Sequence, residues 1–162
     1  MNKILNLLTI SLLMSTPAVA DSLVIQVGAS DVLDEGDALS AVVGIDYHFD
    51  PFITHGRLST GIGIGAQVDD DGDLFLGIGT AATFVLNEKW FIENSFMPGF
   101  YDPGSDGTDL GGNIQFRSIL GIGYNVSDET AISLAVQHIS NASLDSSNPG
   151  NEAITLRYFK RF

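Results

Sequence analysis

Three residues near the end of the chain have the side chains of a hydrolytic triad. The segment VQHISNASLDSSNPGNEAITL, residues 136–156, places His138 and Ser140 two positions apart and Glu152 beyond a loop rich in Asn, Ser, Pro and Gly. A hydroxyl nucleophile, an imidazole base and a carboxylate can together hydrolyse an ester or amide. The residues just before them, AISLAV, have the alternation of a strand with one apolar face. The elements around the three residues therefore decide whether they meet.

The first twenty residues have the pattern of a secretory signal peptide. MNKILNLLTISLLMSTPAVA carries Lys3 near its start, an apolar centre over residues 4–14, and AVA before Asp21. A short positive region, a short apolar core and an A-x-A site are the parts of a cleavable export signal. The apolar run is too short for a transmembrane helix. We predict a mature chain that begins at Asp21, and a retained N-terminal anchor helix is the alternative.

The mature sequence reads as one acidic domain of about 140 residues. The whole chain has 20 Asp and Glu against 7 Lys and Arg, and it has no cysteine. Without a basic stripe there is nothing to neutralise phosphates, which argues against nucleic acid as a partner. The acids cluster in DVLDEGDA, DDDGD and YDPGSDGTD. DDDGD lacks the later glutamate of a calcium loop, so we interpret these runs as solvated loops and predict no metal site.

Strand-like alternation covers the mature chain, and no stretch has a helical period. We predict eight strands, at 22–30, 39–49, 57–68, 74–86, 89–100, 113–124, 130–140 and 152–162. The connections near 50–56, 87–88 and 125–128 are short, whereas those at 31–38, 69–73, 101–112 and 141–151 hold most of the acid, Gly and Pro. Short turns at one end and longer loops at the other are typical of an outer-membrane barrel.

The two faces of the strands favour a membrane barrel over a soluble one. One face is large and apolar, and the other is small, polar and rich in glycine, as in GIGIG, GIGT and GIGY. A soluble barrel fills its interior with bulky aliphatic residues, whereas here the small face suits a narrow lumen in which glycine gives backbone clearance. We therefore predict an all-β fold, an eight-stranded antiparallel transmembrane β-barrel. Parity places four charges inside, where we expect ion pairs: Asp46, Glu93, Arg117 and Arg157.

Aromatic residues support the same architecture. The terminal Phe162 closes an alternating strand and resembles the C-terminal signature of bacterial outer-membrane barrels. An interfacial belt is expected near the short-turn ends, and its candidates are Tyr47, Phe49, Trp90, Tyr124 and Tyr158. Two histidines outside the triad, the lumenal His48 and His55 in a short turn, are interpreted as structural.

Parity also places the triad candidates on the apolar face. His138 and Ser140 alternate in step with the apolar residues of one strand, and Glu152 does so in the next. All three lie at the long-loop end, and the hairpin itself brings them together. Polar groups on a lipid-facing surface are costly, so three of complementary chemistry indicate a function. Parity alone leaves one alternative open, in which Ser140 begins the loop and Glu152 is a solvated acid at the membrane border.

The triad segment resembles a known family. H-x-S-N-A followed by N-x-G-x-E, with twelve positions from the serine to the glutamate, closely resembles the lipid A 3-O-deacylase (PagL-type) family of Gram-negative outer-membrane barrels. The resemblance is sharp over residues 136–162 and architectural elsewhere. It implies that His138 is the general base, Ser140 the nucleophile and Glu152 the acid that orients the histidine.

The same resemblance supplies candidates for the oxyanion hole. Asn148 and Gly150 lie in the loop where the family builds it, and Asn141 matches the asparagine that follows the serine. Two positions depart from the family pattern: Ile139 between the histidine and the serine, where relatives often have an aromatic residue, and Pro149 after Asn148. The proline lies within the segment from which the oxyanion donors would come.

The function implied is an outer-membrane serine esterase that removes the 3-O-linked 3-hydroxyacyl chain from lipid A of lipopolysaccharide. It needs no cofactor, and its active site would face the outer leaflet. Relatives also suggest a homodimer. A non-catalytic small barrel of the adhesin or membrane-stabilising kind is the main alternative. A soluble lipocalin-like carrier is a third, and the outward apolar faces disfavour it.

Overall fold

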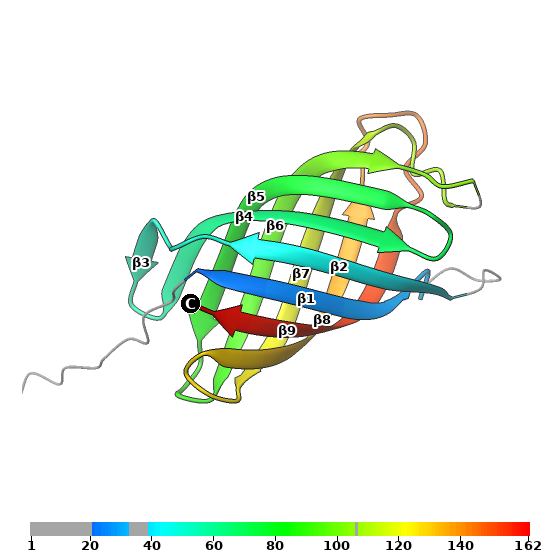
Figure 1. Ribbon diagram of the computed structural model, residues 1–162. Helices are drawn as coiled ribbons and strands as arrows, with labels where there is room; N and C mark the ends of the chain where they lie inside the picture. The colour runs from blue at the N-terminus through cyan, green and yellow to red at the C-terminus, as the bar shows by residue number, and fades with distance from the viewer. Residues whose placement is uncertain (1–20, 33–38, 106) are drawn as a thin grey trace, which may run out of the picture.

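Alternating apolar and polar residues form the strands of a closed antiparallel barrel (Figure 1). The computed structural model describes residues 21–32, 39–105 and 107–162. The predicted signal peptide, residues 1–20, lies outside the described residues, as does most of the acidic run DVLDEGDA. No helix among the described residues is long and apolar enough to cross a membrane.

The strands are antiparallel, and neighbours in the sequence are neighbours in the barrel. Those of the described residues are β1 (Ser22–Ser30), β2 (Ser40–His48), β3 (Ile53–His55), β4 (Leu58–Asp69), β5 (Leu74–Val85), β6 (Trp90–Asp102), β7 (Ile114–Asn125), β8 (Thr130–Ser140) and β9 (Asn151–Arg161). Pairing of β1 with β9 and of β2 with β4 closes the ring. Eight strands therefore form the barrel, which confirms the predicted fold.

The structure has one short strand, β3, that the sequence interpretation did not include. The short turn expected at 50–56 contains β3, which pairs with residues 58–60 at the start of β4. Its three residues are all exposed, His55 among them. β3 is thus a small extension of the turn at the end of the barrel where the C-terminus lies (Figure 1), and it leaves the order of the eight barrel strands unchanged.

The wall of the barrel has the predicted two faces. Along β2, Ile45 is 49% exposed and the next residue, Asp46, is 1% exposed. The same alternation makes a continuous outer band of exposed aliphatic and aromatic side chains, which is the surface that hydrocarbon covers in an outer-membrane barrel. At the short-turn end the rings of Trp90 and Tyr124 meet edge to face, 5.0 Å between centroids. They lie where the aromatic belt was predicted.

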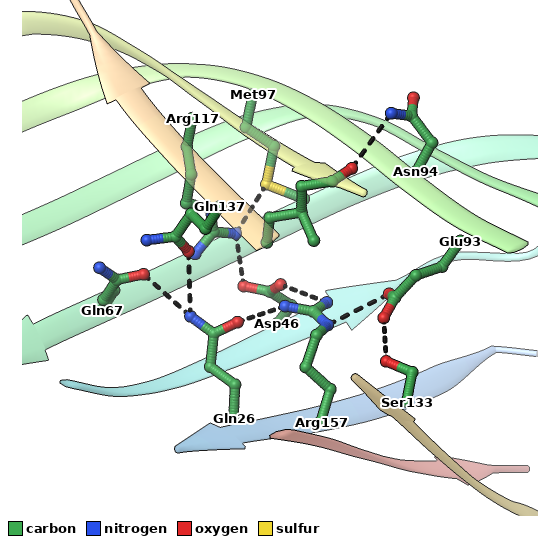
Figure 2. Close-up of polar contacts among 11 residues, drawn as sticks. Gln26, Asp46, Gln67, Glu93, Asn94, Met97, Arg117, Ser133, Gln137 and Arg157 are labelled. Atoms are coloured by element: carbon green, nitrogen blue, oxygen red, sulfur yellow. Dashed lines mark hydrogen bonds and ion pairs between the residues drawn. The ribbon is translucent and has the colours of Figure 1, made fainter. Parts of the chain in front are cut away.

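The lumen is filled at mid-height by a polar network (Figure 2). Arg157 bridges Asp46, at 3.0 Å, and Glu93, at 3.1 Å, and Arg117 binds the other oxygen of Asp46 at 2.6 Å. Two cations and two anions compensate one another, which buried charges require. The four predicted lumenal charges are therefore paired, as expected. Gly65 on β4 shows why the lumen needs glycine, since a Cβ there would overlap the carboxylate of Asp46.

A cavity lies on the short-turn side of this network. It has a volume of about 400 Å³, and its lining includes His48, Phe91, Phe159 and Arg161. His48 is thus in the lumen, as parity predicted. The triad candidates do not line this cavity; they lie at the other end of the barrel and on its outside.

Candidate active site on the outer wall

Strand register brings the triad candidates together. In the β8–β9 pair His138 lies directly opposite Glu152, and Ser140 follows His138 by two residues and so shares its face. The intervening and preceding residues, Ile139 and Gln137, are each 2% exposed and point into the barrel. The three candidates therefore point outward, at the end of β8 that leads into the long loop.

The three side chains form one hydrogen-bonded chain. Glu152 Oε1 lies 2.8 Å from His138 Nδ1, and His138 Nε2 lies 2.8 Å from Ser140 Oγ. The histidine side chain is 46% exposed and that of the glutamate 28%. A carboxylate, an imidazole and a hydroxyl in this order can pass a proton from the hydroxyl to the ring and stabilise the charged ring. The geometry is thus suited to nucleophilic attack on an ester.

Asn141 holds the loops beside the serine. Its Nδ2 group donates to the carbonyls of Leu110, Gly111 and Ser147, at 2.9, 2.6 and 2.6 Å. Its Oδ1 accepts the N–H of Ser143 at 2.8 Å. The side chain is 1% exposed, so it has no free N–H for an oxyanion. In this structure the side chain of Asn141 joins the 103–113 connection to the 141–150 connection. This role differs from that of an oxyanion donor, for which the family resemblance made it a candidate.

The other two oxyanion candidates lie in the loop that leads into β9. Asn148 is exposed, and its Oδ1 accepts the backbone N–H of Asn141 at 2.9 Å. Its Nδ2 has no hydrogen-bond partner among the described residues and could donate to a ligand. Gly150 is buried, with a φ of 79°. A Cβ on Gly150 would lie 3.0 Å from His138 Cε1. Glycine is therefore required here both by the left-handed backbone and by the imidazole beside it.

An apolar surface borders the serine on the β7 side. Phe116 is the direct partner of Ser140 in the β7–β8 pair, and its ring stacks on that of Phe96, 5.7 Å between centroids and 13° between planes. Ser118, opposite His138, is the partly exposed polar residue next to these rings. No sequence motif marks these three residues. Parity places them outward, but only the register between strands places them beside the triad.

The acidic run DDDGD, which the sequence analysis assigned to a solvated loop, ties loops together. Asp70 accepts the hydroxyl of Ser40, and this bond holds the pKa of Asp70 below its usual range. Asp73 accepts the hydroxyl of Tyr101 at 2.5 Å and the N–H of Gly104 at 2.9 Å. Among the described residues, no group of three His, Cys, Asp or Glu is arranged to hold a metal ion.

Comparison with solved structures identifies the fold. The crystal structure of the outer membrane enzyme PagL aligns with a TM-score of 0.67 at 21% identity, over 87% of this chain and 99% of that one. Neisserial surface protein A aligns at 0.54 and 10% identity, over 88% and 96%. Ail of Yersinia pestis aligns at 0.55 and 12% identity, over 88% and 97%. At these identities the likeness concerns the fold alone.

Comparison with protein families goes further. No curated protein sequence matches the chain. The model of the family lipid A 3-O-deacylase (PagL) matches residues 44–161, a span that includes β8, β9 and the loop between them. Because the match covers most of the sequence, the chain belongs to the lipid A 3-O-deacylase family and has the outer-membrane barrel fold.

Proposed function

We propose that the chain hydrolyses the 3-O-linked acyl ester of lipid A with Ser140 as nucleophile, His138 as general base and Glu152 as the group that orients and stabilises the histidine. The observation that carries the proposal is the unbroken hydrogen-bonded chain of these side chains on the outer wall. Family membership supports the substrate class. The position on the wall suits it too, since acyl chains lie in the membrane and a filled lumen gives them no way in.

In the proposed reaction Ser140 Oγ attacks the ester carbonyl while its proton moves to His138 Nε2. The tetrahedral oxyanion collapses as the bond from the carbonyl carbon to the sugar oxygen breaks, and His138 returns the proton to that oxygen. Water then attacks the acyl-enzyme, again giving a proton to His138. A 3-hydroxy fatty acid leaves, and Oγ regains its proton. Glu152 accepts the Nδ1–H throughout and stabilises the imidazolium.

The oxyanion would be stabilised by the Nδ2 group of Asn148. The hydrogen bond that its Oδ1 accepts from the backbone N–H of Asn141 fixes the orientation of that amide before the reaction begins. One preorganised donor of this kind contributes about 3–4 kcal/mol to transition-state stabilisation. The backbone N–H of Gly150, beside the imidazole, is a second candidate.

The site would face the outer leaflet. The triad lies at the end of the barrel that carries the longer connections, opposite the C-terminus (Figure 1). Longer loops on the extracellular side are the rule in such barrels. At that height the ester, which joins sugar to acyl chain, meets the triad at the border between headgroups and hydrocarbon.

The test is Ser140→Ala in purified, refolded protein, with lipid A analysed by mass spectrometry before and after incubation. We expect parent protein to release the 3-hydroxy acid and the variant to release none above background. Equal release by the two proteins would remove Ser140 from the mechanism. Absence of release by the parent, with heat-modifiable migration on a gel showing a folded barrel, would favour the non-catalytic alternative.

A further inference from the structure

We propose that Gln115, inside the barrel, is a positioning residue for the reaction on the outer wall. It fixes the loop segment to which Asn141 is bound, and through Asn141 it sets the amide of Asn148. This role rests on the proposed function, because Asn148 is the oxyanion donor assigned there. Gln115 lies on the inner side of the wall and the triad on the outer side, so Gln115 would act only through other residues.

Gln115 is a buried lumenal residue at the long-loop end of β7. It is 0% exposed, and it follows Ile114, the first residue of the strand, which points outward at 57% exposure. Its Nε2 group donates to the carbonyls of Leu110 and Gly112, at 3.2 and 2.7 Å. An amide nitrogen has two N–H donors, so this one is fully used on the backbone of the 103–113 connection.

The oxygen of the Gln115 amide is unfavourably placed. Oε1 is buried and has no hydrogen-bond partner in the part of the chain that the structure describes. A buried acceptor without a partner is destabilising. Turning the amide over would place Oε1 against two carbonyl oxygens, which would repel it, so the orientation with Nε2 toward the loop is the favourable one. What glutamine supplies at this position, and an apolar side chain would not, is the pair of N–H donors.

The carbonyl of Leu110 joins Gln115 to Asn141. Its oxygen accepts Nε2 of Gln115 at 3.2 Å and Nδ2 of Asn141 at 2.9 Å, since a carbonyl oxygen has two lone pairs. The next carbonyl, of Gly111, accepts Nδ2 of Asn141 at 2.6 Å. The two connections meet in this way at the end of the barrel opposite the C-terminus (Figure 1). Gln115 therefore holds in place the acceptors on which the Asn141 amide depends.

The side chain of Leu110 strengthens the same link. It is 0% exposed and belongs to a buried apolar cluster with Ile139, the inward residue between His138 and Ser140. The other members of the cluster are Phe75, Met97 and Tyr101. Burial of an aliphatic side chain is stabilising. It keeps the connection folded into the barrel, and Gln115 then sets the position of its carbonyls.

The link ends at the proposed oxyanion donor. The backbone N–H of Asn141 donates to Oδ1 of Asn148 at 2.9 Å. Loss of the Gln115 bonds frees the 110–112 segment, which loosens Asn141 and lets the Asn148 amide turn. An amide that is no longer preorganised stabilises the transition state less, but acyl chains still bind to the wall as before. Gln115 should therefore act on kcat and not on KM.

The experiment is a double-mutant cycle on purified, refolded protein, with kcat and KM measured from 3-hydroxy acid release from lipid A. Gln115→Met keeps the length of the side chain and removes both donors. It should lower kcat about 3- to 10-fold, the size expected for one neutral hydrogen bond, with KM within twofold of the parent. Asn148→Ala should lower kcat about 100-fold. In the double variant Gln115→Met should have less than a twofold further effect, because the amide that it positions is gone.

Gln67→Met is the matched control. Gln67 is another buried lumenal glutamine, and its Oε1 accepts Nε2 of Gln26 at 2.8 Å (Figure 2). None of its hydrogen bonds within the described residues reaches the 103–113 or the 141–150 connection. The change should leave kcat unaltered. Heat-modifiable migration shows whether each variant is folded, and Gln115→Leu provides a second variant without donors.

The outcomes separate the two proposals. Multiplied effects in the double variant, a rise in KM without a fall in kcat, or an unchanged kcat in Gln115→Met would each overturn the role of Gln115 and leave the triad intact. An Asn148→Ala variant as fast as the parent would remove the oxyanion donor, and the role of Gln115 with it, again without affecting the triad. Full activity in Ser140→Ala, or no release by the folded parent, would instead refute the proposed function.

Discussion

The charge of Glu152 can be tested separately from its hydrogen bond. Glu152→Gln keeps the size of the side chain and an oxygen that can accept the Nδ1–H of His138, now 2.8 Å from the carboxylate. What it removes is the negative charge beside a ring that becomes cationic during the reaction. The change should therefore lower kcat more than it raises KM.

The size of the effect follows from the exposure of the pair. Two unit charges about 4 Å apart interact by about 4 kcal/mol at an effective dielectric constant of 20. His138 is 46% and Glu152 28% exposed, and fully exposed pairs contribute about 1 kcal/mol or less. We therefore expect Glu152→Gln to lose about 1–3 kcal/mol of transition-state stabilisation, a value between these limits. That loss corresponds to a fall in kcat of roughly 5- to 150-fold. Ser140→Ala should remove activity altogether.

The assay is the initial rate of 3-hydroxy acid release from lipid A at saturating substrate, measured by mass spectrometry in detergent. Glu129→Gln is the matched control, because Glu129 is an exposed carboxylate in the β7–β8 turn that pairs with Lys160 of β9. It should leave kcat unchanged. A Glu152→Gln rate within twofold of the parent would refute the assigned role of the carboxylate. A loss as complete as that of Ser140→Ala would refute the argument from exposure.

Three other substitutions probe the surroundings of the site. Gly150→Ala should lower kcat at least tenfold while the barrel still folds, because a non-glycine residue in the left-handed backbone conformation costs about 1–2 kcal/mol and the new Cβ meets His138. The rate of 3-hydroxy acid release measures kcat, and heat-modifiable gel migration measures folding. Asn141→Ala should speed proteolysis in the two loops that it joins and lower activity, and Asn141→Asp should not rescue either, since a carboxylate cannot donate to three carbonyls. Asp46→Asn leaves two buried arginines with one acid, which should lower the free energy of unfolding by about 3–5 kcal/mol. The temperature at which the variant changes its gel migration should therefore fall. Asp145→Asn, in an exposed loop, should leave that temperature unchanged.

The barrel could be predicted because the alternation of residues is local. Parity alone decides that Ile45 faces outward and Asp46 inward, and the sequence contains that pattern in the eight strands of the barrel. β3 was missed for a physical reason. A three-residue ladder between Pro51 and Gly56 depends on pairing with β4, and the local signals around it are those of a turn.

The proximity of His138, Ser140 and Glu152 could be predicted because one hairpin contains them, whereas the residues that hold the surrounding loops come from distant segments. The partners of Asn141 include Leu110 and Gly111, about thirty positions earlier in the chain. Family resemblance made this asparagine a candidate donor, but its hydrogen bonds show that it anchors the loops. Ser118 reaches His138 only through the register of β7 on β8. Side-chain hydrogen bonds and register depend on pairing across the fold, which parity does not determine.

The division between lumen and wall shows how the proposed reaction can proceed on a small barrel without an internal substrate pocket. Arg117 and Arg157 with their acids fill the lumen at mid-height, and the cavity of about 400 Å³ lies beyond them, at the end away from the triad. A membrane-bound ester cannot reach that cavity without leaving the hydrocarbon. On the outer wall the lipid itself forms the other side of the site, and the protein has only to supply reacting groups and an apolar surface such as the Phe96–Phe116 pair. The proposed reaction therefore requires a filled interior and reacting groups on the exterior, the reverse of an enzyme that binds its substrate in an internal pocket.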